Sequence, residues 1–529
     1  MFSQFAKKKS FIIIASLLLL LSVISITLYI FIKLKYNLDS DIAAEMLLGK
    51  EILTEHQLFP AHWYYSTEIR FLNIQLLFAL FIKLTGNLLF SKSIANFLMI
   101  VLYGISFILL MISLKIKKNS IILNLALILT PLSTTMLYCL FQGAFYTAYI
   151  IFIFCTLALW IKMKDTKKKS WVLFLLFYIS LAISLFMGMQ GTRMLVNLYI
   201  PLAFSEMVML WLDMRGDQLK ISFKNILIRF YFTASLLLFS AVGFIINRVL
   251  ISGIYHYSDF GVQSFSNYQD IGNRLILSLS AMVSFLGGIG EGNIISIGGV
   301  SSVLKLILIL LSIIMLIKLL IDYKHLDDGK KSMVIFTSLS VLISIYLATF
   351  SNILIIDRYF INGPILLMPI IFVFMEQYKN KLVKIDKYII VALIIGCIIL
   401  SQYSFIRQSF ISNQSEIKTK QQLSIIKTLE RENLNFGYAT FWNADILSVL
   451  SNDRVKIANF GYSLNGQPYL WLTPARYYTS NYHKGSTFLL LTKEEYKSIN
   501  KKLVKGNTKI LRRYDYVIIK YRKNPFNNR

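Results

Sequence analysis

Long apolar runs, separated by short polar and basic stretches, fill most of the chain before residue 406. A helix needs about 20 apolar residues to cross the hydrocarbon core of a bilayer. The pattern predicts eleven transmembrane helices, at 11–32, 94–114, 120–139, 144–161, 171–187, 194–212, 226–250, 302–320, 333–351, 362–378 and 388–405. The first run follows Lys7-Lys8-Lys9 and is too long for the apolar part of a cleaved signal peptide, so we expect a retained anchor.

The segment 69–90 is also apolar, but Lys83 interrupts it and two polar residues, Asn73 and Gln75, lie near its start. We interpret it as a helix in the membrane interface. With the N-terminus inside, the short inside segments then carry 23 Lys and Arg and the outside loops carry 11, as the positive-inside rule expects. If 69–90 crossed the membrane, the basic clusters that follow it would change sides.

An odd number of spans places residues 407–529 outside. This segment predicts a small α/β domain, with a helix at 421–433, short helices at 444–451 and 493–502, and β-rich runs at 437–442, 455–460, 487–491 and 516–521. The predicted fold is therefore an α-helical polytopic membrane protein. Its transmembrane domain is 1–406, with a first external loop at 33–93, and its C-terminal α/β domain is extracytoplasmic.

Composition excludes other classes of protein. Residues are 56% hydrophobic and only 16% charged, which excludes a disordered chain. The three cysteines (Cys139, Cys155 and Cys397) lie in apolar runs, so neither a disulfide framework nor a zinc cluster is expected. The net charge is +28, and the basic clusters lie in the loops between spans. This pattern indicates that the charge sets the membrane topology rather than binds nucleic acid. The excess of basic residues in 407–529 suits either anionic lipid headgroups or an anionic acceptor.

The first external loop holds the clearest candidate chemistry. Asp39 and Asp41 precede a helix predicted at 42–49, which also carries Glu45. The acids suit two roles, since they can cap the helix or act as a catalytic carboxylate pair at the membrane surface. Farther along the loop, Trp63-Tyr64-Tyr65, Glu68 and Arg70 suit either a membrane-interface belt or a sugar-binding surface.

Two other outside turns carry single cations. Arg193 follows Gly191, and Arg358-Tyr359 precedes a span. Arg193 either snorkels from a tight turn or binds a phosphate, and Arg358 either forms a local pair with Asp357 or binds a phosphate through its planar fork. Glu291, in a glycine-rich external loop, is an acid without an assigned role. No nucleotide-binding loop, nucleophile elbow or zinc-protease motif occurs in the sequence.

These features together resemble the multi-spanning glycosyltransferases of the GT-C type, which include protein O-mannosyltransferases and the aminoarabinose transferases that modify lipid A. Asp39-Ser40-Asp41 occupies the position of their acidic motif, and 42–49 and 69–86 resemble their two juxtamembrane helices. The resemblance extends to Leu84-Thr85-Gly86-Asn87, to Arg358-Tyr359 and, in the C-terminal domain, to 438–445.

The sequence departs from this family at three places. Asp-Ser-Asp replaces the usual Asp-Glu pair, and Ser66-Thr67-Glu68-Ile69-Arg70 replaces the proline-rich start of the second juxtamembrane helix. The second external loop, 140–146, has no acid where relatives that bind a divalent cation use one. No cofactor is therefore expected, and dependence on a divalent cation is in doubt.

The resemblance implies a polyprenyl-phosphate sugar as donor, an envelope glycan, lipid or protein as acceptor, a plasma-membrane location among membrane lipids, and inversion at the sugar. Asp39, and after it Asp41, is then the expected general base. Arg193 and Arg358 are expected to neutralise the leaving phosphate. The expected substrate-binding residues are Glu45, Trp63, Tyr64, Tyr65, Glu68, Arg70, Arg193, Arg358 and Tyr359.

Three other functions fit parts of the same pattern. A protein that exports or polymerises envelope polysaccharide also needs many spans and external arginines, but gives Asp39 and Asp41 no special role. A secondary transporter is disfavoured, because the spans lack clustered acids and no inverted repeat is visible. A non-catalytic scaffold with the GT-C architecture would explain the missing acid in the second external loop.

Overall fold

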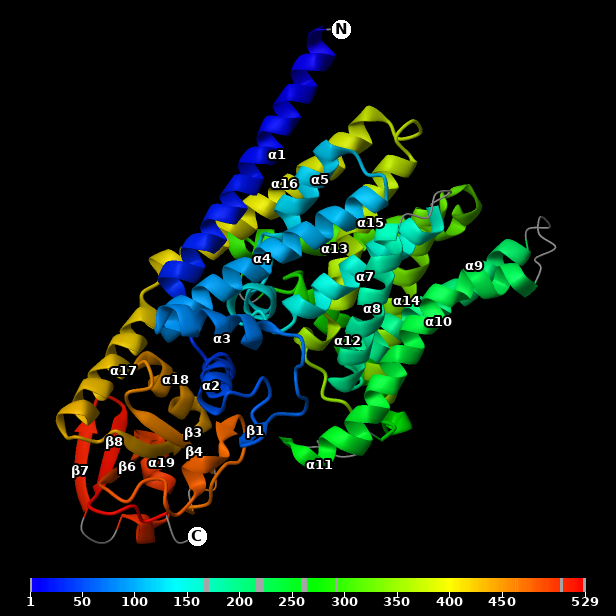
Figure 1. The fold of residues 1–529 in the computed structure, drawn as a ribbon. Helices are drawn as coiled ribbons and strands as arrows, with labels where there is room; N and C mark the ends of the chain where they lie inside the picture. Colours follow the sequence, from blue (N-terminus) through cyan, green and yellow to red (C-terminus); the bar gives the residue numbers. More distant parts are fainter. Residues whose placement is uncertain are drawn as a thin grey trace. The chain divides into compact units, whose positions relative to one another are not determined.

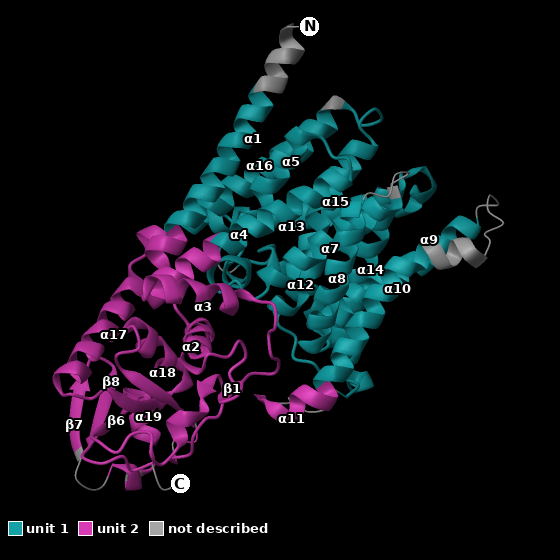
Figure 2. Ribbon diagram, viewed as in Figure 1, with its two compact units in different colours: residues 1–28, 98–247, 261–409 teal, residues 29–97, 248–260, 410–529 magenta. Residues whose placement is uncertain are grey.

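The computed structural model describes residues 2–165, 171–215, 223–257, 264–290, 293–461, 463, 465–504 and 508–526. The chain divides into two compact units (Figure 2). Residues 1–28, 98–247 and 261–409 form one, which we call the helical unit. Residues 29–97, 248–260 and 410–529 form the other, which we call the mixed unit. The first external loop and the C-terminal segment thus belong to the same unit.

Within the described residues, nine helical stretches are long and apolar enough to cross a membrane. They are Ser10–Tyr36, Leu88–Ser113, Thr147–Lys164, Trp171–Met189, Leu195–Met214, Arg229–Ile254, Ile297–Ile321, Asp328–Phe350 and Ile385–Arg431. The prediction of a polytopic helical protein is confirmed. The number eleven is not, because the predicted spans 120–139 and 362–378 correspond to shorter helices.

The long helices of the helical unit are drawn in Figure 1. They are α1 (Phe2–Leu28), α7 (Thr147–Asp165), α8 (Trp171–Met189), α9 (Ile200–Met214), α10 (Phe223–Ile246), α12 (Ile271–Phe285), α13 (Ile297–Ile321), α14 (Asp328–Phe350) and α16 (Lys384–Ile406). Helix α4 (Leu88–Ser113) starts in the mixed unit and belongs to the helical unit from residue 98 on. Helices α8 and α10 approach closely through two glycines. A Cβ at Gly188 would lie 1.9 Å from the Ser240 carbonyl oxygen, and one at Gly243 would lie 2.0 Å from that of Leu185. Small residues permit such contact between apolar helices.

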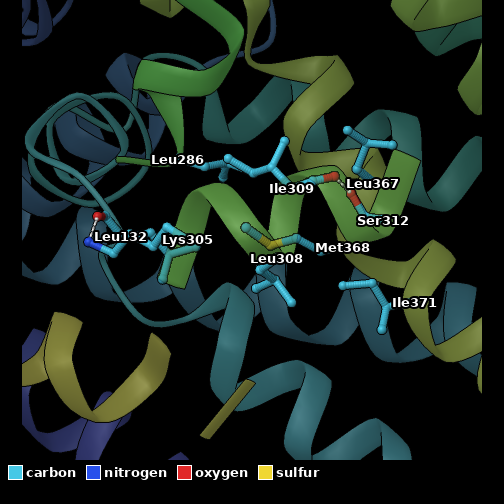
Figure 3. Close-up of a pocket in the computed structure, with 9 residues that line it drawn as sticks. All are labelled: Leu132, Leu286, Lys305, Leu308, Ile309, Ser312, Leu367, Met368 and Ile371. Atoms are coloured by element: carbon cyan, nitrogen blue, oxygen red, sulfur yellow. Dashed lines mark hydrogen bonds between the residues drawn. The ribbon is translucent and has the colours of Figure 1, made fainter. Parts of the chain in front are cut away.

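The predicted span 120–139 is broken. Helix α5 (Lys118–Ile128) ends before Pro131, and helical structure resumes with α6 (Thr134–Met136) and a π-helix, Leu137–Gln142. Proline has no N–H and disfavours the helical conformation of the preceding residue, so the break has a local cause. The Lys305 ammonium donates to the Leu132 carbonyl oxygen at 2.6 Å. Figure 3 shows this bond at one end of a small cavity with mostly apolar lining.

The other short helix, α15 (Asn362–Gln377), is among the most buried elements of the helical unit. All residues from Asn362 to Val373 are buried, and α15 packs against α13 and α14. A helix that is apolar on every side is expected to lie inside other helices rather than at a surface. This burial explains why a segment with an internal proline, Pro369, remains helical among its neighbours.

In the described part of the mixed unit, the C-terminal segment forms a five-stranded sheet with the strand order β4-β3-β6-β8-β7. The strands are β3 (Phe436–Thr440), β4 (Lys456–Phe460), β6 (Thr487–Thr492), β7 (Thr508–Arg513) and β8 (Tyr516–Tyr521). β3 is parallel to β4 and β6, whereas β8 is antiparallel to β6 and β7. Four of these strands were predicted. The basic edge strand β7 was not predicted, because its sequence does not alternate between apolar and polar residues.

Helices α17 (Gln414–Arg431) and α18 (Phe441–Leu450) contribute to the apolar core on one face of this sheet, through side chains such as Ile425, Leu429 and Leu447. A second core, rich in aromatic rings, covers the other face. The short helix α19 (Lys493–Ser498) follows β6 and starts with a capping box between Thr492 and Glu495. The predicted helices of this segment are therefore confirmed, with shifted ends.

A second sheet joins the first external loop to the C-terminal segment. In the part of the mixed unit that is described, β1 (Trp63–Tyr65) lies between β2 (His256–Tyr257), which follows α11 (Ser252–Ile254), and β5 (Thr473–Pro474). The pairing β1–β5 is antiparallel, with Trp63 opposite Pro474. Strands far apart in the sequence thus fix the middle of the loop that carries the acidic motif.

Two helices of the first external loop differ in length from the prediction. Helix α2 spans Ser40–Glu55 and continues through Gly49. A Cβ at Gly49 would meet the Phe78 ring at 2.3 Å, so this glycine permits close packing of α3 on α2 rather than ending the helix. Helix α3 covers only Ile74–Thr85, starts at the capping Asn73 and ends at Gly86, which has a φ of +67°.

Candidate functional site

The acidic motif lies at the N-terminus of α2. Asp39 is the N-cap, and its Oδ1 accepts a hydrogen bond from the Ile42 amide at 2.8 Å. Ser40 is buried and Asp41 occupies the first turn. The capping role is therefore real for Asp39. It uses one carboxylate oxygen, and the helix dipole favours negative charge on both acids.

A buried charge cluster lies next to the motif. Glu45, one turn into α2, is 3.4 Å from both the Arg70 guanidinium and the Lys92 ammonium. Arg70 also pairs with Glu68 at 3.4 Å. Asp39 lies within electrostatic range of Lys92. The Glu45 carboxylate is thus engaged with two cations, and it orders them beside Asp39.

Lys92 is the residue of this cluster that sequence reasoning missed. Its side chain is 1% exposed and belongs to the apolar helix α4. A lone lysine near the start of a membrane-spanning run was the available signal, because such charges are costly unless they are paired.

Asp41 has different neighbours. It lies within electrostatic range of Asp445 on α18 and of Tyr469, both in the C-terminal segment. Asp445 is 1% exposed. Burial raises its pKa well above the ordinary value, and the nearby Asp41 carboxylate adds to this effect, whereas a hydrogen bond with Asn459 opposes it. The pKa of Tyr469 is likewise raised by burial and by Asp41. The two acids of the motif therefore experience different electrostatic surroundings.

The predicted aromatic surface of the first loop is largely internal. Trp63 is 0% exposed and Tyr65 is buried, with its hydroxyl donating to the Pro60 carbonyl oxygen at 2.9 Å. Tyr64 is half-buried, and its ring centroid lies 5.5 Å from that of His256 and 6.4 Å from that of Tyr478. Of these three rings, Tyr64 alone is partly exposed to solvent. Trp63 and Tyr65 hold the second sheet together.

In the helical unit, the two predicted arginines converge. The Arg193 guanidinium lies over Tyr146 and Tyr149, 5.1 and 5.5 Å from their ring centroids. The Arg358 guanidinium makes a cation–π contact with the neighbouring Tyr359, 5.7 Å from its ring centroid. Both guanidiniums lie within electrostatic range of the Cys139 thiol. Two cations from separate loops are thus brought to one region, as a binding site for an anionic group requires.

Tyr359 is 39% exposed, and the neighbouring Asp357 has a pKa raised by burial. Glu291 lies outside the described residues. Within the described ranges, no group of three or more His, Cys, Asp or Glu side chains could hold a metal ion.

Most of the chain is similar to a solved structure. The crystal structure of ArnT from Cupriavidus metallidurans bound to undecaprenyl phosphate matches 94% of this chain and 97% of its own, with a TM-score of 0.52 and 10% sequence identity. The chain has a GT-C fold. At this identity the likeness concerns the fold alone.

Two further solved structures match this chain with lower TM-scores. The archaeal oligosaccharyltransferase AglB from Archaeoglobus fulgidus, in complex with an inhibitory peptide and a dolichol-phosphate, matches 92% of this chain and 69% of its own, with 12% identity and a TM-score of 0.44. Apo ArnT from Cupriavidus metallidurans matches 97% and 98%, with 11% identity and a TM-score of 0.44. No family model and no curated protein matches the sequence.

Proposed function

We propose that the protein is a membrane glycosyltransferase that moves a sugar from a polyprenyl-phosphate donor to an acceptor of the cell envelope, with inversion, on the outer face of the membrane. The observation that carries this proposal is the acidic motif at the start of α2, near the buried Lys92 and the partly buried Arg70. ArnT, whose fold is similar, has undecaprenyl phosphate bound in its structure. The acceptor is a glycan, lipid or protein.

In this mechanism a carboxylate removes the proton from the acceptor hydroxyl or amine. Asp39 is the proposed base and Asp41 the second candidate. The deprotonated acceptor attacks the anomeric carbon, a new glycosidic bond forms, and the bond from that carbon to the phosphate oxygen breaks. The polyprenyl phosphate leaves with the electron pair, and each turnover inverts the anomeric configuration.

The cations stabilise the charge that the leaving group acquires. Arginine donates two parallel hydrogen bonds to a phosphate, so Arg193 and Arg358 are the proposed phosphate ligands. Arg70 and Lys92 hold Glu45 of α2 in place and supply further positive charge near the acidic motif. Tyr64, Glu68 and Tyr359 are proposed to contact the sugar or the acceptor, while Glu45, Trp63 and Tyr65 position the loop.

Sugar transfer in membranes tests this proposal. Wild type, Asp39→Asn, Asp41→Asn and the exposed control Asp515→Asn are expressed in a host that lacks the protein, and radiolabelled polyprenyl-phosphate sugars are supplied. We expect wild type and Asp515→Asn to transfer label to envelope fractions. Loss of a general base costs about 10²–10⁴-fold in rate, so one of the motif variants is expected to show at least a hundredfold loss.

Each result has a defined meaning when membrane levels of the variants are equal. The motif variant with the larger loss identifies the base. Full transfer by both Asp39→Asn and Asp41→Asn would refute the catalytic assignment. No transfer from any donor by wild type would favour polysaccharide export or a scaffold role. A parallel assay in EDTA tests dependence on a divalent cation.

A further inference from the structure

A pair of aromatic rings, Tyr469 and Trp471, lies on the segment that joins the two sheets of the mixed unit, and Tyr469 is within electrostatic range of Asp41. Tyr469 and Trp471 are both half-buried, and their ring centroids are 6.4 Å apart with an interplanar angle of 29°. Tyr469 also packs against Phe441 at the start of α18, with 6.1 Å between ring centroids. These rings are on the C-terminal segment, where the proposed chemistry assigns no residue.

The backbone that carries the two rings is fixed on both sides. The Tyr469 amide donates to the Asn459 carbonyl oxygen at 3.0 Å, and the Asn459 side-chain amide donates to the Trp471 carbonyl oxygen at 2.8 Å. Pro468 pairs with Phe460 at the edge strand β4, and Thr473 begins β5, which pairs with β1. Such anchoring holds the rings in place before a ligand arrives, which reduces the entropy lost on binding.

Helix α18 links this aromatic pair to the acidic motif. It packs along α2, and its buried Asp445 shares electrostatic contact with Asp41. The Tyr469 ring is within electrostatic range of the Asp41 carboxylate as well. On the first turn of α18, Trp442 is 57% exposed and its ring contacts Phe441 at 5.3 Å. A carboxylate near a partly exposed Tyr ring that stacks with a Trp ring is the chemistry that recognises sugar rings, which present C–H groups to the aromatic face and hydroxyls to the acid.

We propose that Tyr469 and Trp471 form a stacking platform for a pyranose ring, which places one of its hydroxyls toward Asp41. This inference rests on the proposed function, because it assigns a sugar subsite to the same reaction. The sugar belongs either to the polyprenyl-phosphate donor or to a glycan acceptor. In both cases the C-terminal segment determines which sugar is accepted, and Trp63 and Tyr65, which are buried, do not.

Binding of simple glycosides to the full-length protein in detergent tests the platform without requiring turnover. The probes are methyl glycosides of common hexoses, N-acetylhexosamines and aminopentoses, observed by saturation-transfer difference NMR. We expect at least one of them to bind the wild type and the control variant equally. Trp471→Ala and Tyr469→Ala are expected to raise its Kd at least fivefold, while Trp471→Phe keeps most of the affinity. The matched control is Tyr514→Ala, an exposed ring beyond the opposite edge strand β7.

The transfer assay identifies the source of the sugar. An increase in KM for the polyprenyl-phosphate sugar in Trp471→Ala assigns the platform to the donor, and an increase in KM for the acceptor assigns it to the acceptor. Thermal unfolding of each variant shows whether it is folded, and Trp471→Phe serves where the alanine variant is not. Wild type that binds no glycoside, or binding that is unchanged in Trp471→Ala and Tyr469→Ala, overturns the inference.

The two proposals fail in distinguishable ways. If glycosides bind at Trp471 but wild type transfers no sugar, the platform is supported and the glycosyltransferase proposal fails. If wild type transfers sugar and Trp471→Ala has unchanged KM values for donor and acceptor, the platform fails and the function stands.

Discussion

Asp445 is a carboxyl group with almost no exposure to solvent, and its Oδ2 has no hydrogen-bond partner among the described residues. A group whose pKa is higher in the folded than in the unfolded state binds its proton more tightly when folded. Its contribution to stability is therefore greatest below the unfolded pKa, about 3.9, and is lost as the pH rises through the folded pKa. Asp445 is thus a source of instability at neutral and alkaline pH.

We expect Asp445→Asn to remove this penalty. The amide has nearly the same shape and carries no charge, so the unfolding temperature at pH 7–8 should rise, by about 2–4 °C for each kcal/mol recovered. The difference from wild type should shrink as the pH falls toward 4. Thermal unfolding of the two proteins across this pH range measures it. The matched control is Asp453→Asn, since Asp453 pairs with Lys50 and its loss should lower stability. An unfolding temperature of Asp445→Asn below wild type at pH 8 would contradict the prediction.

At the scale of secondary-structure elements, two consecutive residues of α2 form ion pairs with the C-terminal segment. Lys50 pairs with Asp453, and Glu51 pairs with Arg476, whose Nη2 is 2.5 Å from Oε1. The Asn452 side chain also accepts from the Leu88 amide at 2.9 Å and donates to the Gly86 carbonyl oxygen at 3.2 Å, at the junction of α3 and α4. The helix that presents the acidic motif is therefore positioned from outside the first external loop.

The Glu51–Arg476 pair gives a test of this positioning. Glu51 is buried, and burial raises its pKa while Arg476 lowers it. Removing one partner of a buried pair costs about 3–5 kcal/mol, because it strands the other charge, whereas replacing both costs less. We expect Arg476→Met, which leaves the buried Glu51 unpaired, to lower the unfolding free energy by this amount. Glu51→Gln should lower it by less, because Arg476 is partly exposed, and the double variant should lose less than the sum. Denaturant unfolding measures this cycle.

The control for the cycle is Arg454→Ala, because its pair with Glu430 is largely exposed and is expected to contribute about 0–1 kcal/mol. Additive losses in the Glu51–Arg476 cycle would mean that the pair does not couple α2 to the C-terminal segment. Transfer activity measured on the same variants separates loss of fold from loss of position.

The sequence predicts elements that depend on local pattern and misses those that depend on distant contacts. The strands β3, β4, β6 and β8 are apolar enough to be recognised, and Asp39 carries the signature of a helix cap. The relation of Asp41 to Asp445 and Tyr469 joins residues about 400 positions apart, and no periodicity encodes it. The same holds for Trp63. The sequence suggests an aromatic residue of the membrane interface, but Trp63 is buried in a strand that pairs with Pro474.

For the whole molecule, the broken segment 118–142 decides the topology. Helix α5 has 11 residues and rises only about 17 Å, short of the roughly 30 Å that a bilayer core requires. Irregular backbone is tolerated at that depth when protein groups satisfy it. Lys305 binds the Leu132 carbonyl oxygen (Figure 3), and the Ser133 hydroxyl donates to that of Phe285 at 2.5 Å. We therefore expect α5 and its continuation to cross the membrane together.

Cysteine labelling tests this crossing. With the N-terminus inside, a crossing at 118–142 places Lys324, in the turn between α13 and α14, on the cytoplasmic side, whereas a segment that does not cross places it outside. We expect a membrane-impermeant maleimide to label Lys324→Cys only after permeabilisation and to label Ser463→Cys in intact cells. The wild type serves as the background, because Cys139 and Cys397 are buried and Cys155 is partly buried. Labelling of Lys324→Cys in intact cells would show that 118–142 does not cross the membrane. The basic loops after this segment would then lie on the opposite sides from those that the positive-inside rule assigns.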